Sequence, residues 1–432
     1  MAVEERELPI LMLQYGGEQA TRSILIRGAR QLLTLRGPRG LRRGGDLNEL
    51  GIIHDGALLV CGGVVQEVGP SRRVENLAEA RGAVEVNAVG RVVMPGFVDS
   101  HTHVVFPPAG TAPGDHAGAV RAIHTCSAKL LASRAQTHFE SMARHGTTTV
   151  EVKTGCGPDE TAELKVLQSL AGFRGYPADV LPTVLMRLPD AGTASEMERT
   201  TAATWMAAEL LPRIWRRGLA LYADLVWDPD PAMYPLFLRY LEAARVLGFA
   251  RKIHSGPGTP SGEVLTAVEN GALSIDHLDR ADAAELSLLA RGSTVATLLP
   301  CASFCGGTRL GPGRALVDGG AAVALATSFN PRHTPMLSMQ TVVSLACLQM
   351  GLTAGEAISA ATINGAHALG RADRVGSLER GKSADLLLLN IGDYRDLAHH
   401  LGMNLVHLTM KRGEFIYQEG KVARRPVDSL RV

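Results

Sequence analysis

In the stretch Pro95-Gly96-Phe97-Val98-Asp99-Ser100-His101-Thr102-His103, two histidines stand one residue apart, shortly after the apolar run 92–94. On an extended strand, residues i and i+2 point to the same face. His101 and His103 can therefore direct two imidazoles toward one point. Zinc and iron favour this type of ligand. The stretch predicts a strand that ends in a pair of metal ligands.

Seven more strand-like runs follow this stretch, with helix-like segments between them. The runs end at Lys153, Met186, Trp227, His254, His277, Leu299 and Thr327. The helix-like segments are 128–144, 160–173, 195–217, 231–246, 261–269, 281–290 and 312–318. Eight strands that alternate with helices predict a closed (β/α)8 barrel, an α/β fold, over residues 95–370. The active sites of such barrels lie at the carboxyl ends of the strands. Two further helices, 336–350 and 354–369, are expected to cover the barrel.

The two ends of the chain have a different pattern, because short strand-like runs are separated by glycines. Such runs fill the region before residue 94 and return at 384–389 and 415–417. We expect residues 21–94 and 371–432 to pair into a small composite β-sandwich domain. Residues 1–20 are expected to form a flexible N-terminal arm.

The composition is that of an ordinary globular protein, with 46% hydrophobic and 20% charged residues among 432. A net charge of +1 gives no electrostatic reason to expect nucleic acid or an anionic membrane as partner. No apolar run reaches the roughly 18 residues of a membrane-spanning helix. Six scattered cysteines favour reduced thiols over a disulfide framework. These features predict a cytoplasmic protein.

Several longer motifs resemble the amidohydrolase superfamily and, within it, imidazolonepropionase, which opens an imidazolone ring in histidine degradation. The motifs are PGFVDSHTH (95–103), GTTTVEVKTGCG (146–157), KIHSG (252–256), SIDHL (274–278), ATLLP (296–300), ALATSFNP (324–331) and AATINGAHALG…GSLERGKSADLLLL (360–389). They stand in the family's order over roughly residues 90–390. The resemblance implies a hydrolase with a metal-dependent barrel, a β-sandwich built from both chain ends, and a homodimer.

Carried over residue by residue, the resemblance makes His101, His103 and His254 ligands of a divalent metal, zinc or iron. It makes His277 the sixth-strand histidine that contacts the substrate or the attacking water. A bound metal would lower the pKa of a water and polarise the ring carbonyl. Asp99 is expected to be structural, and Asp276 to orient its neighbours.

The chain departs from the family pattern at several positions of the site. Ser328 stands where the family has a metal-binding aspartate, and Pro257 where it has the catalytic glutamate. Cys156 replaces a tyrosine. The family's arginine after H-x-H has no counterpart in 104–108, and its third-strand histidine is absent from 185–188. These changes remove the acidic proton acceptors and predict a substrate that differs from imidazolonepropionate.

With both carboxylates gone, His277 is the best remaining base, since its ordinary pKa lies near neutrality. We therefore predict His277 and Ser328 as catalytic residues. The predicted substrate-binding residues are Lys153, Cys156, Asn330 and Arg332, with Arg332 as a new anion contact.

Other histidines and cysteines are less informative in the sequence. His333 lies in a strand-end loop and is a further candidate for ligand contact. We expect His124, His138 and His145 to face solvent. Cys301 and Cys305, like Cys156, follow a strand, and for all three a plain thiol is commoner than a reactive one.

Three hypotheses remain open on the sequence alone. The first is a divergent imidazolonepropionase-like amidohydrolase that cleaves a C–N bond in a small cyclic amide or related heterocycle. The second is a barrel that works without metal and catalyses a cyclisation, dehydration, isomerisation or addition. The third is a non-catalytic pseudoenzyme. The four histidines favour an enzyme, because a pure binder has no reason to keep them.

Overall fold

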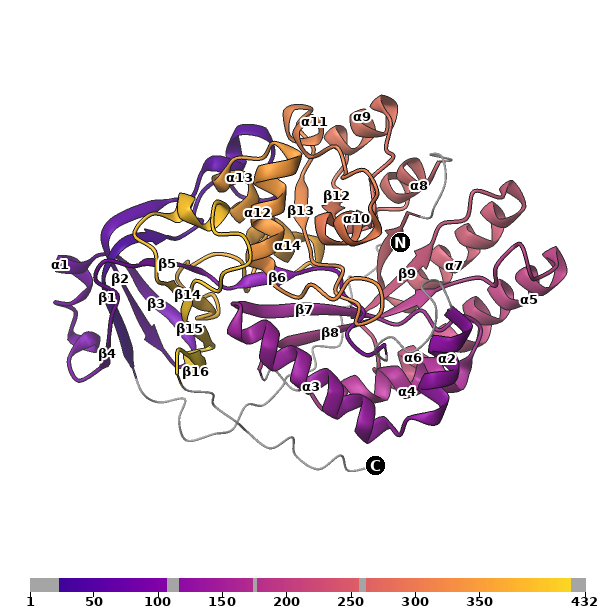
Figure 1. Ribbon diagram of the computed structural model, residues 1–432, viewed down its shortest axis with the longest axis horizontal. Coiled ribbons are helices and arrows are strands. Elements are labelled where there is room, and N and C mark those ends of the chain that lie inside the picture. The colour runs from indigo at the N-terminus through magenta and orange to yellow at the C-terminus, as the bar shows by residue number, and fades with distance from the viewer. Residues whose placement is uncertain (1–22, 107–115, 174–176, 256–261, 421–432) are drawn as a thin grey trace, which may run out of the picture.

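A computed structural model of the chain describes residues 23–106, 116–173, 177–255 and 262–420. The predicted arm 1–20 and the position of Pro257 lie outside these residues. The molecule has two parts, a β domain and a barrel, and the indigo and yellow ends of the chain lie together in the β domain (Figure 1).

The β domain is one eight-stranded mixed sheet in the order β16-β15-β14-β5-β1-β2-β3, with β4 beside β1. Its N-terminal strands are β1 (Ile24–Leu33), β2 (Ile52–Cys61), β3 (Val64–Pro70), β4 (Val84–Asn87) and β5 (Val92–Pro95). Its C-terminal strands are β14 (Leu386–Leu389), β15 (Val406–Lys411) and β16 (Glu414–Gln418). β5 joins the two sets, because it pairs parallel with β1 and antiparallel with β14. The prediction that both chain ends build this part is confirmed.

The second sheet is the predicted barrel, with eight parallel strands in consecutive order. The strands are β6 (Phe97–Asp99), β7 (Thr147–Lys153), β8 (Asp179–Met186), β9 (Tyr222–Val226), β10 (Ala250–His254), β11 (Ser274–Asp276), β12 (Val295–Leu298) and β13 (Val323–Leu325). Each ends within a few residues of the position expected from the sequence. Along β7, Val150 and Val152 pack outward under the helices, so Glu151 and Lys153 face the interior.

The barrel closes between its first and last strands through contacts just beyond their ends. Thr102 forms a parallel bridge with Phe329, and the Ser328 amide donates a 3.0 Å hydrogen bond to the His101 carbonyl. Below this bridge, the Asp99 carboxylate accepts hydrogen bonds from the Thr327 amide (3.0 Å) and hydroxyl (2.6 Å). Closure therefore fixes the two predicted histidine ligands against Ser328. The expectation that Asp99 is structural agrees with these bonds.

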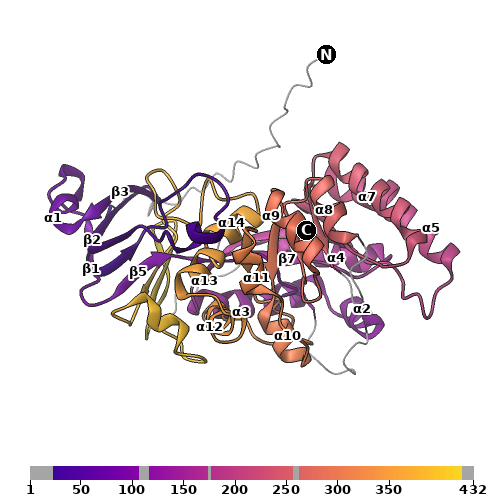
Figure 2. The same ribbon diagram turned by 90° about the horizontal axis from the view of Figure 1, so that it is seen from above.

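Helices surround the barrel, and several of their bounds follow capping residues. The helices are α2 (His116–Thr125), α3 (Ala128–Arg144), α4 (Glu160–Leu170), α5 (Glu196–Trp205), α6 (Leu211–Arg216), α7 (Tyr234–Leu247), α8 (Glu263–Glu269), α9 (Ala283–Arg291), α10 (Pro300–Gly306) and α11 (Gly313–Asp318). α12 (Met339–Met350), α13 (Ala354–Ala360) and α14 (Ile363–Ala368) then lie between the barrel and the β domain (Figures 1 and 2). Ser127 caps α3, and Asp282 with Glu285 forms a capping box on α9.

The helix predictions differ from the structure in four places. The segment predicted as one helix over 354–369 is divided into α13 and α14. The segment predicted as one helix over 195–217 is interrupted, because the π-helical turn η4 (Met206–Leu210) separates α5 from α6. The sequence reading missed α2 and α10, which are short and lie inside loops after strands β6 and β12. No helix among the described residues is both long enough and apolar enough to cross a membrane.

Short 3₁₀ and α turns complete the fold: η2 (Gly44–Asn48), α1 (Ser71–Val74), η3 (Ala78–Ala80), η5 (Pro231–Met233) and η6 (Tyr394–Ala398). A buried ion network joins the two parts of the molecule. Lys411, at the end of β15, contacts Asp179 (2.6 Å) at the start of β8 and Asp385 (2.5 Å) beside β14. Arg412 adds a second contact with Asp179 at 2.6 Å.

The Asp99 contacts give a test of how the barrel closes. We expect Asp99→Ala to lower the free energy of unfolding by roughly 2–4 kcal/mol, because two buried hydrogen bonds are lost and the Thr327 donors stay unsatisfied. Urea denaturation measures this change. Asp373→Ala, at an exposed carboxylate, is the matched control and should stay within about 0.5 kcal/mol of wild type. An equally small change for Asp99→Ala would contradict this account of closure.

Candidate metal centre and active site

Four imidazoles from three parts of the chain meet at the carboxyl ends of the barrel strands. The His101 ring centroid lies 5.3 Å from that of His103, 5.1 Å from His254 and 5.3 Å from His277. The rings of His254 and His277 are 4.4 Å apart. One nitrogen each of His101, His254 and His277 lie within 4.8 Å of one another, close enough to share one ion. The predicted ligand His103 is not part of this group, and its ring centroid lies 6.3 Å from that of His254. The histidines at the ends of β6, β10 and β11 thus form a single cluster.

The ring nitrogens of this cluster fit a metal ion better than they fit the protein around them. His101 Nε2, His103 Nδ1 and His254 Nδ1 are all buried and have no hydrogen-bond partner among the described residues. A buried polar atom without a partner costs about 1–3 kcal/mol, so three such atoms together need an explanation. A divalent cation held by three imidazoles is a known type of zinc site. The donor set therefore suits a divalent metal.

The orientation of His101 is fixed by Asp276 at the end of β11. His101 Nδ1 lies 2.8 Å from Asp276 Oδ2, and both side chains are fully buried. Burial opposes the charge of Asp276, but Lys153, Lys252 and His101 outweigh it and hold the pKa of this carboxyl well below its usual range. An ionised carboxylate can only accept, so Nδ1 carries the proton and Nε2 keeps its lone pair. The predicted orienting role of Asp276 has a direct structural basis.

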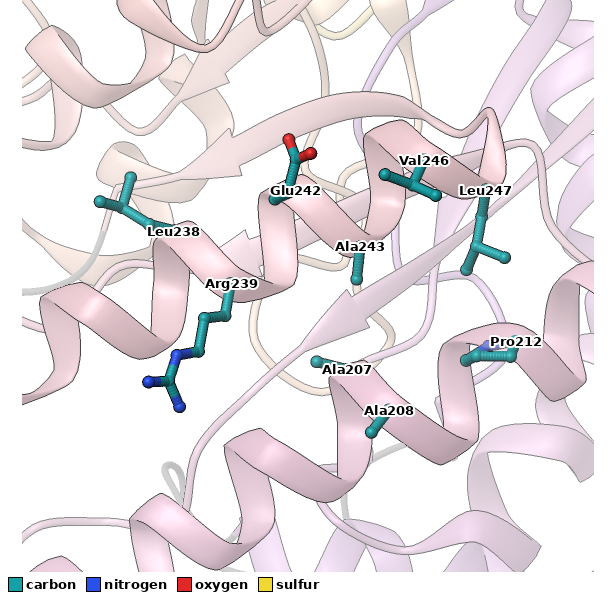
Figure 3. Close-up of a pocket in the computed structure, with 9 residues that line it drawn as sticks. All are labelled: Ala207, Ala208, Pro212, Leu238, Arg239, Glu242, Ala243, Val246 and Leu247. Carbon is teal, nitrogen blue, oxygen red and sulfur yellow. The ribbon is translucent and has the colours of Figure 1, made fainter.

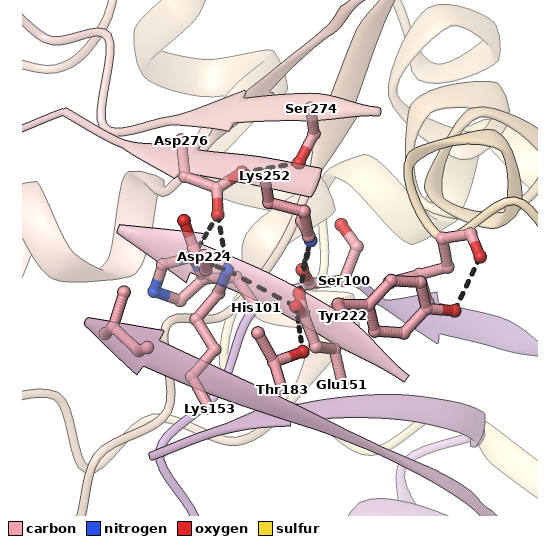
Figure 4. A network of polar contacts seen from close by, with 12 residues as sticks. Ser100, His101, Glu151, Lys153, Thr183, Tyr222, Asp224, Lys252, Ser274 and Asp276 are labelled. Carbon is pink, nitrogen blue, oxygen red and sulfur yellow. Dashed lines mark hydrogen bonds and ion pairs between the residues drawn. The ribbon is translucent and has the colours of Figure 1, made fainter. Parts of the chain in front are cut away.

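Beneath the histidines lies a buried network of charges (Figure 4). Lys153 Nζ contacts Asp224 at 2.5 Å, Asp276 at 2.9 Å and Glu151 at 3.3 Å. Lys252 Nζ contacts the other oxygen of Glu151 and the Ser100 carbonyl, the latter at 3.1 Å. The network thus contains two ammonium groups and three carboxylates, so it has a formal excess of one negative charge. That excess favours a cation in the cluster above.

Burial and neighbouring charges act together on the ionisable groups of the site. Burial lowers the pKa of Lys153, but Asp224, Asp276 and Glu151 outweigh it and raise the value well above the ordinary one. Burial also lowers the pKa of His103 to about 3 and that of His277 to about 4. The imidazoles are therefore neutral at pH 7, which is the form that binds metals or accepts a proton. A pKa of about 4 also makes His277 a weaker base than the ordinary value used in its prediction.

His277 and Ser328 share an unusual backbone conformation at the mouth of the barrel. Their φ angles are +65° and +54°, in the left-handed region that side chains other than glycine rarely adopt. Such residues cost of order 1–3 kcal/mol each and cluster at functional sites. The conformation turns each side chain away from the direction it would have on a continued strand. Both predicted catalytic residues thus stand at the rim beside the imidazole cluster.

The predicted substrate-binding residues have different surroundings. Lys153 is fully buried, and protein carboxylates occupy its ammonium, so it has a structural place in contrast to the substrate contact expected from the sequence. Asn330 Oδ1 accepts from the Arg332 amide at 2.9 Å and shapes the loop after β13. Cys156 is buried, and burial raises the pKa of its thiol well above the usual value. For Cys156, Asn330 and Arg332, substrate contact stays a prediction.

The structure also places two further cysteines and two further histidines that the sequence analysis considered. Burial raises the pKa of Cys301 and of Cys305, which lie on α10, so neither is a thiolate at pH 7. His138 was expected to face solvent, but its ring is half-buried and meets Phe329 edge to face, with centroids 4.9 Å apart. His124 is exposed and contacts Asp159 at 2.6 Å.

Sequence reasoning missed most of the buried network and Arg187. Asp224, Glu151 and Lys252 are charged residues inside strand-like runs, and this pattern was the available signal. Arg187 directly follows β8, at the position where the sequence was read only for a missing histidine. A charged residue at a barrel strand end is itself a signal of function.

A shallow groove lies elsewhere, on the outer helix layer between α7 and the η4–α6 segment (Figure 3). It is lined by Ala207, Ala208, Pro212, Leu238, Arg239, Glu242, Ala243, Val246 and Leu247. None of these residues belongs to the histidine cluster or to its network. The groove carries no part of the chemistry described here.

The contact between Asp276 and His101 predicts the effect of a mutation on metal affinity. We expect Asp276→Asn to weaken zinc binding roughly 10–100-fold, because the amide no longer holds His101 with its Nε2 lone pair free. Competition with a chromophoric chelator measures the affinity. Ser274→Ala is the matched control, since it removes only the 3.0 Å hydrogen bond to Asp276 Oδ1 and should have a smaller effect. Unchanged affinity in folded Asp276→Asn protein would refute this role.

Comparison with known proteins places this geometry in a family. Residues 250–416 match the model of the amidohydrolase family. The chain is 35% identical to the imidazolonepropionase of Geobacillus kaustophilus (strain HTA426), over 93% of this chain and 99% of that protein. It is 37% identical to the imidazolonepropionase of Deinococcus radiodurans, over 88% of this chain and 96% of that one.

Solved structures share the fold at lower identity. A triazine hydrolase variant has a TM-score of 0.72 at 16% identity, with 94% of this chain and 97% of that chain covered. An adenosine deaminase from Xanthomonas campestris with bound zinc has a TM-score of 0.66 at 20% identity, with 94% and 95% covered. With the sequence relatives, these findings show that the chain belongs to the amidohydrolase superfamily, in its imidazolonepropionase-like group, and is a hydrolase.

Proposed function

We propose that this protein hydrolyses a C–N bond in a small cyclic amide related to an imidazolone, with a divalent zinc or iron ion as cofactor. The observation that carries the proposal is the set of three buried, unpartnered imidazole nitrogens on His101, His103 and His254. The sequence relatives, which are imidazolonepropionases, support the imidazolone-like ring. The departures at Ser328, Cys156 and Pro257 support a substrate that differs from imidazolonepropionate itself.

His101, His103 and His254 would hold the metal. When bound, such an ion supplies a Lewis acid for the ring carbonyl and lowers the pKa of a water. His277 comes next to this group, with its ring 4.4 Å from that of His254. As a neutral imidazole at the rim, His277 accepts the proton of the attacking water and returns it to the leaving nitrogen. No carboxylate is needed for this transfer.

Ser328 has a different part in this scheme. Its amide donates to the His101 carbonyl, so its side chain starts from a point fixed against the metal-binding strand. A serine hydroxyl can donate a hydrogen bond to a polar substrate group, whereas an aspartate at this position would bind the metal. The excess negative charge of the network below offsets the missing carboxylate. Asn330 and Arg332, two and four residues further on, complete the pocket wall.

Two statements about the whole protein are part of the proposal. We propose that the chain forms a homodimer and acts in the cytoplasm, as the resemblance and the scattered cysteines suggest. We also propose the domain division 21–94 with 371–432 and 95–370, with 1–20 as an arm. Light scattering of the purified protein tests the homodimer.

Metal content and hydrolysis should be lost together in His103→Ala. We expect wild-type protein to bind about one zinc or iron ion per chain and His103→Ala to bind it at least roughly tenfold more weakly, because one of three ligands is gone. Elemental analysis after dialysis and turnover of a panel of cyclic amides are the two measurements. His400→Ala, at an exposed histidine, is the control. A wild-type protein that stays metal-free and indifferent to added Zn²⁺, Fe²⁺ or Mn²⁺ would favour the metal-independent barrel instead.

Ser328→Asp tests the proposed division of labour at the eighth strand. Aspartate tolerates positive φ better than serine, so the variant should fold, and its carboxylate should tighten zinc binding several-fold. We expect the native reaction to slow at the same time, since the hydroxyl donor is lost. Ser328→Ala is the matched control, because it removes the hydroxyl without adding a ligand. Tighter binding in Ser328→Ala as well would show that the carboxylate is not the cause.

A further inference from the structure

Arg187 stands at the mouth of the barrel and has no partner among the residues that the structure describes. It directly follows Met186, the last residue of β8, and β8 lies between β7 and β9 in the barrel. Its Nε is buried and has no hydrogen-bond partner, and no ion pair joins its guanidinium to any residue that the structure describes. A guanidinium carries five donors, and for the buried one, Nε, the lack of a partner is costly. The Arg187 guanidinium is therefore available to bind an anion.

The positive charge of Arg187 affects histidines at other strand ends around the barrel mouth. It acts on His103 at the end of β6, on His277 after β11 and on His333 in the loop after β13, lowering the pKa of each in addition to burial. A side chain directed outward from the barrel would not reach residues of three other strand ends. Arg187 thus faces the space in front of the imidazole cluster.

Glu163, the acidic residue that acts most strongly on Arg187, forms no ion pair with it. Glu163 on α4 lies within electrostatic range, and its Oε1 accepts from the amides of Cys156 (2.6 Å) and Gly155 (3.3 Å). Its Oε2 is buried and, like Arg187 Nε, has no hydrogen-bond partner among the described residues. Burial raises the pKa of Glu163 to about 7, so this carboxyl is only partly ionised at neutral pH. No ion pair forms between the two side chains within 4.0 Å. The positive charge of Arg187 is therefore available to a ligand.

We propose that Arg187 is a specificity-determining residue, which binds a carboxylate carried on the ring of the substrate while the ring itself meets the imidazole cluster. This inference rests on the proposed function. A planar guanidinium pairs with a carboxylate through two parallel hydrogen bonds, which gives orientation as well as affinity. Arg332 adds a second positive charge near His333, so the mouth as a whole favours an anionic substrate.

This placement gives Arg187 a role that sequence comparison alone does not suggest. In this arrangement the substrate ring lies at the ends of β6, β10 and β11. Arg187, at the end of β8, binds the carboxylate that the ring carries. A neutral analogue of the same shape would leave the Arg187 guanidinium, with its buried Nε, unpaired. Discrimination between charged and neutral ligands therefore depends on this residue.

The test is calorimetric titration of the metal-loaded protein with imidazole-4-propanoate and with its neutral carboxamide. Wild type should bind the carboxylate roughly 10–100-fold more tightly than the amide, the range expected for hydrogen bonds to a charged group. Arg187→Met should lose this preference and keep the affinity for the amide. Arg187→Lys should keep part of it, since the charge remains but the planar pairing is lost. Arg217→Met, at an exposed arginine, is the control.

Two results would overturn the proposal. The first is wild-type protein that binds both ligands equally or binds neither. The second is Arg187→Met that keeps the full preference. If Arg187 only balances Glu163, then Arg187→Met lowers stability, Glu163→Gln restores it in the double variant, and the preference is unchanged. Metal content and amide turnover are measured on the same samples, so a lost preference in a protein without hydrolysis would support Arg187 while refuting the proposed function.

Discussion

The structure depends on the ammonium group of Lys153, which is buried in the barrel among Asp224, Asp276 and Glu151. A charge can be buried only when other charges and hydrogen bonds surround it, and removing one partner of such a set typically costs 3–5 kcal/mol. Each partner comes from a different strand or from the same strand two residues away. The network therefore holds the inner faces of β7, β9 and β11 at fixed positions relative to one another.

The chemistry of the mouth follows from this buried network. Lys153 keeps Asp276 ionised, Asp276 fixes the tautomer of His101, and His101 then presents its free nitrogen beside His254 and His277. Closure of the barrel between Thr102 and Phe329 brings Ser328 to the same place. The site is thus built on rigid strands and supported from below, which is the arrangement that precise positioning requires. Its formal excess of one negative charge prepares it for a cation.

The sequence was sufficient to predict the architecture and the imidazole cluster, because both produce local sequence patterns. The H-x-H motif follows a short apolar run, and the strand-end histidines His254 and His277 close similar runs. The buried charges were harder to predict, since Asp224 and Lys252 become partners only through the pairing of separate strands. Arg187 was missed for the same reason: its surroundings come from β6, β11 and the loop after β13.

Two smaller differences have physical causes of their own. The break at η4 lies in a segment with continuous helical periodicity. The π-helical turn packs against α7, and the sequence pattern does not encode this contact. The half-buried place of His138 depends on Phe329, which reaches α3 only because the barrel closes at that point. Long-range contacts of this kind decide burial and partners, whereas local periodicity decides the type of element.

The most direct test of the central claim is X-ray diffraction from zinc-loaded crystals, recorded on both sides of the zinc absorption edge. The account predicts one strong anomalous peak at the carboxyl ends of β6 and β10, within about 2.0–2.1 Å of nitrogens of His101, His103 and His254. Zinc bound only elsewhere on the surface, or no peak after saturation, would contradict it.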